Sequence, residues 1–153
     1  MSSNVTNRKT VRQALAAGLS AALVHTTTGD GKPLDALYGY RKSKIEKNFV
    51  AVVTSAPTDR KKQAQPTRVA SFIQLEIVIF TIYSATDFTE EESEDKADDL
   101  EKAVADWIED NDTTDDWEEL QQSGPTEYDV VTLVSGKTYR IETIPVRLQA
   151  HSD

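Results

Sequence analysis

The chain has no cysteine and only two histidines among its 153 residues. Without cysteine it can form no disulfide, no thiolate nucleophile and no cysteine-based metal site. The two histidines, His25 in a threonine-rich segment and His151 in a polar tail, do not supply the ligand set of a usual zinc site. No Ser-His-Asp arrangement can be recognised around them either. We therefore interpret both as surface histidines and predict no catalytic residues, no cofactor and no metal.

Long apolar runs are also missing. The longest, Ile77 to Tyr83, is far too short to span a bilayer, and Met1 to Thr10 lacks the apolar stretch of a signal peptide. With 28% charged and 38% hydrophobic residues, the composition is typical of a soluble globular protein. We expect a single domain over residues 1–153, with a polar N-terminal tail at 1–9 and no membrane contact.

The charges of this chain are unevenly divided. Between Asp87 and Glu119 lie 17 of the 26 acidic residues but only two of the 17 basic ones, Lys96 and Lys102. This segment has a net charge of −15, and the rest of the chain has a net charge of +6. Such asymmetry indicates how the protein meets and orients its partners, because summed charge steers association and does not set the fold. Adaptation to a very salty environment is an alternative explanation.

Two helices are predicted from capping residues and apolar spacing. The first has Thr10 as N-cap with Gln13 as capping-box partner, and ends near Leu23. The second follows the capping box of Thr89 and Glu92. Apolar residues of the second helix fall within about 100° on a helical wheel, at Ala97, Leu100, Val104, Trp107 and Ile108.

Strands are predicted where β-branched residues gather or apolar and polar residues alternate. Ser71–Ser84 has both faces apolar toward its end, which indicates a central strand covered on both sides. A β-hairpin is predicted around Ser135 and Gly136. Further strands are expected at 49–54 and 37–40, and a short third helix at 116–122. Pro145 in the second hairpin arm suggests an edge strand or a bulge.

These elements predict an α+β fold: a mixed or antiparallel sheet, with a long acidic helix and an N-terminal helix packed on it and a C-terminal β-hairpin. The segment at about 56–68 is almost free of apolar residues, so we expect a mobile basic loop. We predict that its bases contact an acidic surface of a neighbouring subunit or of another component of an assembly, with the acidic helix as first candidate. The candidate interface residues are Arg60, Lys61, Lys62 and Arg68 in the loop and Glu91, Asp95, Asp98 and Asp99 in the helix.

Two short motifs do not match known ligand sites. Gly29–Lys32 lacks the spacing of a phosphate-binding P-loop and is read as a turn. Asp110–Asp116 lacks the glycine and the ligand pattern of an EF-hand calcium loop. We interpret most of the acids in the second helix as a solvated face.

The order of elements resembles the tail-terminator, or tail-completion, proteins of long-tailed bacterial or archaeal viruses. The residues that carry the likeness are Val11–Leu19, the strand ending Val78–Tyr83, Thr89–Glu92 with the helix through Leu100, Val104 and Ile108, and the hairpin Val130–Ile144. It covers roughly Thr10 to Leu148. The acidic helix exceeds what this family leads us to expect.

The resemblance implies a non-enzymatic virion protein that assembles in the host cytoplasm as a ring, in this family a hexamer. Such a ring caps the tail tube, joins it to the head connector and lets DNA pass only through its lumen. Its partners would be further copies of itself, the tail tube protein and a head connector or adaptor protein. A head–tail adaptor or stopper of the same neck region is an alternative. An acidic DNA mimic that inhibits a nucleic-acid-binding protein is an alternative of another class.

Overall fold

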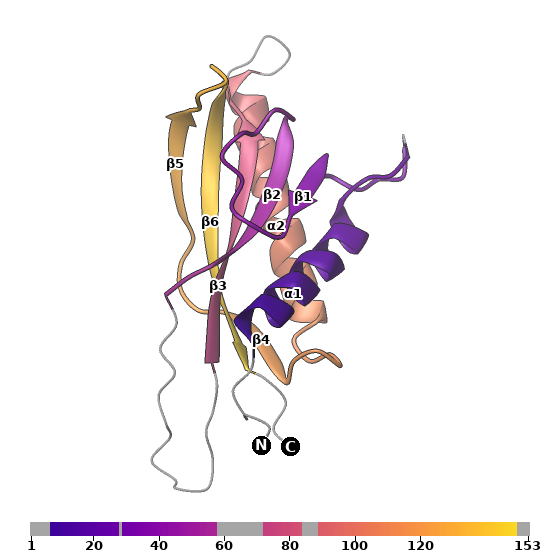
Figure 1. The fold of residues 1–153 in the computed structure, drawn as a ribbon. Helices are drawn as coiled ribbons and strands as arrows, with labels where there is room; N and C mark the ends of the chain where they lie inside the picture. The colour runs from indigo at the N-terminus through magenta and orange to yellow at the C-terminus, as the bar shows by residue number, and fades with distance from the viewer. Residues whose placement is uncertain (1–6, 28, 58–71, 84–88, 150–153) are drawn as a thin grey trace, which may run out of the picture.

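The computed structural model describes residues 7–27, 29–57, 72–83 and 89–149. Its elements follow in the order α1 (Arg8–Leu23), β1 (Ala36–Tyr38), β2 (Phe49–Ser55), β3 (Phe72–Ile82), α2 (Glu90–Asp110), β4 (Glu119–Gln122), β5 (Glu127–Thr132) and β6 (Thr138–Gln149). Figure 1 shows the long strands β3 and β6 side by side, with α2 running along the sheet.

The strands form one mixed sheet in the order β1-β2-β3-β6-β4, and β5 also pairs with β6. Strand β1 is parallel to β2, and the other pairs are antiparallel. The predicted α+β class with a mixed sheet is therefore confirmed. The predicted hairpin is present as β5 and β6, with Gly136 at a φ of 86° in its turn. That left-handed conformation suits glycine because it has no Cβ.

Pro145 does not lie in an edge strand, so that expectation is wrong. Strand β6 pairs with β3 along one edge, and with β5 and β4 in succession along the other. Pro145 falls between the last residue paired with β5 and the first paired with β4. Its carbonyl accepts a hydrogen bond from Ser123 N at 3.0 Å. Since the N and O of a strand residue point to the same side, the missing N–H faces this interruption and costs no ladder hydrogen bond.

Helix α1 begins one turn earlier than its sequence pattern predicts. The N-cap is Asn7 rather than Thr10, and Asn7 Oδ1 accepts hydrogen bonds from Lys9 N at 2.9 Å and Thr10 N at 3.4 Å. Asparagine is at least as good a cap as threonine, so the helix gains a turn. Its end at Leu23 agrees with the prediction.

Helix α2 has the predicted capping box. Thr89 Oγ1 accepts a hydrogen bond from Glu92 N at 3.1 Å, and Glu92 Oε1 accepts one from Thr89 N at 3.4 Å. Among the residues predicted to face the sheet, Trp107 is only partly buried and the others are buried: Ala97, Leu100, Val104 and Ile108.

The predicted helix at 116–122 is wrong, because its second half is strand β4. Leu120 is buried in the core, and its backbone N donates to Asp112 O at 2.8 Å. Glu118 N donates to Gln149 O at 2.8 Å. Pairing with the end of β6 therefore determines the conformation of this segment and overrides its local preference.

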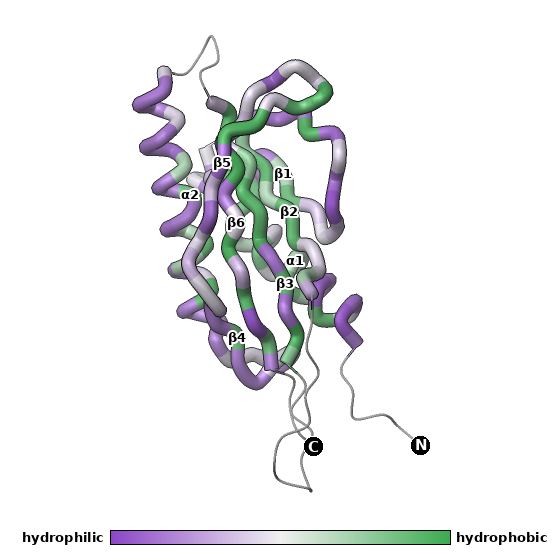
Figure 2. The backbone as a smooth tube through the Cα atoms, turned by 90° about the vertical axis from the view of Figure 1, so that its left-hand side faces the viewer, coloured by the Kyte–Doolittle hydropathy of each residue, from purple (hydrophilic) through white to green (hydrophobic). Residues whose placement is uncertain are grey.

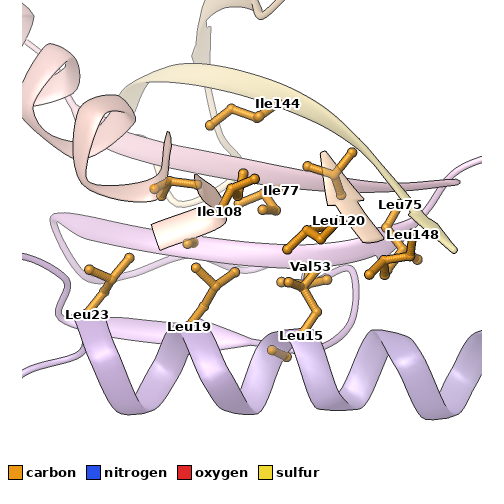
Figure 3. Packing of buried hydrophobic residues seen from close by; sticks show 14 of the residues in the cluster. Leu15, Leu19, Leu23, Val53, Leu75, Ile77, Ile108, Leu120, Ile144 and Leu148 are labelled. Atoms are coloured by element: carbon orange, nitrogen blue, oxygen red, sulfur yellow. The ribbon is translucent and has the colours of Figure 1, made fainter. Parts of the chain in front are cut away.

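Both helices pack on one face of the sheet. Apolar residues of α1 and α2 belong to a single buried cluster with alternate residues of β2, β3 and β6. In Figure 3, Leu15, Leu19 and Leu23 of α1 point toward the sheet, near Val53. This cluster forms the larger part of the core.

The opposite face carries a smaller buried cluster, which lies partly under the segment that joins β1 to β2. Its members are Ile45, Val50, Val52, Phe80, Ile82 and Tyr139. Ile45 comes from the joining segment and covers residues of β2, β3 and β6. Strand β3 is thus apolar on both faces toward its end, as its sequence predicts.

Candidate assembly surfaces

The outer face of α2 is strongly acidic. The helix carries eleven acidic residues and only Lys96 and Lys102 as bases. The four predicted interface residues of α2 are all exposed: Glu91, Asp95, Asp98 and Asp99. The structure brings these four together along one helix. The four bases predicted to oppose them, Arg60, Lys61, Lys62 and Arg68, lie outside the described residues, as does most of the 56–68 loop.

A second group of charges lies where α2 passes over β6. Arg140 is only 6% exposed, and its Nη1 forms an ion pair with Glu94 Oε2 of α2. The Arg140 guanidinium also lies over the ring of Tyr128, 4.2 Å from its centroid. Glu142, two residues further along β6, is 7% exposed. The name acidic seam is used below for Glu94, Asp98 and Glu101 of α2, Tyr128 of β5, and Arg140 and Glu142 of β6.

Carboxylates in the acidic seam interact strongly with one another. Burial raises the pKa of Glu101, and the charges of Glu142, Asp98 and Asp106 raise it further. Burial lowers the pKa of Arg140. The hydrogen bond and charge of Glu94, with the charges of Glu142 and Asp98, outweigh burial and raise this pKa above its ordinary value. Glu94, Glu142 and Asp98 act on Arg140, and Glu101 is a fourth carboxylate of the seam, so the seam keeps excess negative charge.

Segment 39–48 is called here the basic cover. It begins beside α1, where Gly39 O accepts a hydrogen bond from Arg12 Nε at 2.9 Å, and continues onto the face of the sheet opposite α2, where Ile45 is buried. The hydroxyl of buried Tyr139 donates to Lys47 O at 2.9 Å, which holds the segment against β6. Lys137 Nζ donates to Glu46 O from the hairpin turn. The cover carries four bases, Arg41, Lys42, Lys44 and Lys47, against one acid. Lys42 lies over Tyr38 at 4.7 Å, and the ring centroids of Tyr38 and Tyr40 are 5.8 Å apart.

The two charged surfaces are therefore on opposite sides of one sheet. Figure 2 shows α2 on one side, hydrophilic over most of its length, and the chain between β1 and β2 on the other. A subunit of this kind has an acidic face and a basic face.

His25 is exposed, as expected. Its Nε2 lies 2.7 Å from Asp35 Oδ1, and Asp35 Oδ2 accepts a hydrogen bond from Phe49 N at 3.1 Å. The pair therefore links the loop after α1 to the start of β2. His151 lies outside the described residues.

The segment Gly29–Lys32 is a turn, as predicted. Carboxylate oxygens of Asp30 accept hydrogen bonds from Thr26 N at 2.9 Å and from Lys32 N at 3.1 Å. These bonds, the one from Thr26 first, lower the pKa of Asp30. Their partners are backbone groups of the same turn, so the carboxylate shapes the loop.

A shallow cavity of about 400 Å³ lies between the end of α2 and β4. Glu109, Asp112 and Glu119 line it, together with apolar and amide side chains. No hydroxyl, thiol or imidazole side chain is among the lining residues.

Within the described ranges, no group of three or more His, Cys, Asp or Glu side chains is arranged to hold a metal ion. In the same ranges no helix combines the length and the apolar character needed to cross a membrane. Comparison of the chain with models of known protein families and with curated proteins gives no match.

Sequence reasoning missed the Arg140 group and the basic cover as a surface. The Arg140 group has a signal in the sequence of β6. Arg140 and Glu142 occupy alternate positions on the same face of the strand as Ile144, Val146 and Leu148. Charges at core-facing positions of a strand need partners, and here α2 supplies one. The basic cover could be recognised as a surface only once its place opposite α2 was known.

Proposed function

We propose that this protein is a structural virion protein, a tail terminator whose copies form a ring at the end of the tail tube. The ring joins the tube to the head connector, and its partners are further copies of the chain, the tube protein and a connector or adaptor protein. Support comes from the order of elements in the sequence, and the α+β architecture agrees with what that resemblance implies. We assign the protein no catalytic role.

The observation that carries this proposal is the placement of opposite charges on opposite sides of the sheet. A contact between two different surfaces of the same subunit is heterologous, and such contacts close into rings when the rotation per subunit permits. Complementary charges guide the encounter and set its register more than they add affinity. An isologous contact through either face would bring like charges together.

A second candidate is an acidic DNA mimic, favoured by the eleven acids of α2. Carboxylates along the helix would then stand in for phosphates. The basic cover weighs against it, because a protein that imitates DNA has no use for a positive face of its own. A head–tail adaptor or stopper is the alternative within the neck region.

Two measurements test this proposal: the mass of the assembly in solution and the position of the chain in the virus particle. Native mass spectrometry and imaging of the purified chain should show a closed ring. Imaging of virus particles with the chain labelled should place it where head and tail meet. Detection of the chain elsewhere in the particle, or only outside particles, would rule out a neck protein. A monomer or dimer that binds a basic nuclease would favour the mimic.

A further inference from the structure

Large exposed apolar side chains occur on both charged surfaces and in the turn after β5. Within the part of the chain that the structure describes, they are Tyr40, Tyr128, Val130 and Val134, exposed by 54%, 64%, 43% and 104%. Tyr40 belongs to the basic cover, and the other three belong to β5 and the turn that follows it. Exposed apolar groups bordered by charges are typical of protein interfaces.

Strand β5 offers a side-chain face rather than a free backbone edge. Tyr128 and Val130 have the same parity in β5 and stand beside Glu142 and Arg140 of β6. The Val130 backbone N donates to the Asp129 side chain at 2.8 Å. This occupied N–H interrupts the row of free donors that an added strand would need. A partner is therefore expected on the side-chain face of β5, next to α2.

The floor of this face has an unsatisfied polar group. Arg140 is only 6% exposed. Its Nε is buried and has no hydrogen-bond partner among the described residues. Buried donors normally have partners, and an unpaired one is costly. The carboxylates beside it outnumber it, and burial, followed by the charges of Glu142, Asp98 and Asp106, raises the pKa of Glu101. An arriving partner that brings cations would offset the excess of carboxylates.

We propose that the acidic seam, with Val130, is the docking surface for the basic cover of a second copy of this chain. The cover has four bases and the exposed ring of Tyr40, which match the seam's carboxylates and the exposed Tyr128. The second copy is the occupant because the complementary surface lies on the same molecule, on the opposite face of the sheet. This interface deepens the ring assembly proposed above and rests on it.

Charge reversal on each side tests the pairing. The seam variant is Asp98→Lys with Glu101→Lys, and the cover variant is Arg41→Glu with Lys47→Glu. At low salt, each alone should raise the protein concentration needed for half-assembly at least about tenfold. An equimolar mixture should assemble again, because every contact then joins either two wild-type or two reversed surfaces. Sedimentation velocity gives the readout, and circular dichroism checks folding.

The matched control is Glu109→Lys with Asp110→Lys, which makes the same charge change at the far end of α2. It should assemble like the wild type. Equal loss in the control and the seam variant, or a mixture that does not recover, would overturn the pairing.

Cysteine cross-linking separates this interface from the proposed function. The chain has no cysteine, so Tyr40→Cys and Val130→Cys introduce unique thiols. Mixed and oxidised, the two variants should form a disulfide-linked heterodimer, in yield at least about fivefold above that of Val130→Cys mixed with Asp110→Cys. No such product, even when the wild type forms a ring, would overturn the interface and leave the ring. If the wild type stays monomeric and the mixed cysteine variants give no product, the interface is overturned as well, and particle imaging would still decide the location.

Discussion

The two faces of the sheet are built in different ways. Among the residues that the structure describes, the helix-covered face has a continuous cluster of twenty buried residues from both helices and most strands, whereas the cluster on the opposite face has six. Part of the smaller cluster lies under segment 39–48, which has no regular secondary structure and is held by hydrogen bonds from Tyr139 and Lys137. The first face supplies most of the buried apolar area and therefore most of the stability. The second can carry a charged surface segment, since less of the core depends on it.

Strand β3 has a buried isoleucine on each face of the sheet. Ile77 faces the helices and is 0% exposed, and Ile82 lies on the opposite face and is 3% exposed. Ile77→Ala should cost about 2–5 kcal/mol of unfolding free energy, near the upper end. Ile82→Ala should fall near the lower end, because an irregular segment can collapse into the cavity. Chemical denaturation measures both. Equal losses would contradict the difference between the faces.

The anchor of the basic cover can be removed without changing the core's shape. Tyr139→Phe deletes the hydroxyl that donates to Lys47 O and should cost about 1 kcal/mol. Amide hydrogen exchange should rise within 39–48 and stay unchanged in α1. A uniform rise in exchange across the chain would mean that Tyr139 acts through global stability alone.

The smallest expected effect concerns the acidic seam. The pKa of Glu101 is raised in the folded state, so the folded chain holds this proton more tightly than the unfolded chain does. Deprotonation at neutral pH therefore costs stability. The cost begins to fall as the pH drops through the folded-state pKa and is gone below the unfolded-state pKa. Glu101→Gln should raise the thermal midpoint slightly at neutral pH and leave it unchanged in acid. The exposed Glu109→Gln serves as the control. A gain that persists in acid would show that charge is not its cause.

Local patterns predicted the elements whose residues fix their own conformation. The capping box of Thr89 and Glu92, the apolar stripe of α2 and the turn at Gly136 are present as expected. Patterns failed at residues 119–122 and at Pro145. There the conformation depends on which strand lies alongside, and that partner is distant in sequence.

The candidate surfaces, too, could be predicted from the sequence only in part. That α2 is acidic and exposes Glu91, Asp95, Asp98 and Asp99 follows from counting charges along an amphipathic helix. That Arg140 meets Glu94 does not follow from sequence, since 46 positions separate them.

By itself, the sequence determined the absence of thiol chemistry, the helical and strand periods and the uneven division of charge, because these are properties of residue identity and short-range spacing. Only the tertiary structure decided on which side of the sheet each charge lies. The path of 39–48 across the face opposite α2 depends on Ile45 reaching the second core and on Tyr139 holding Lys47. The hydrogen bond between Tyr139 and Lys47 joins residues 92 positions apart, and packing rather than local preference selects such contacts.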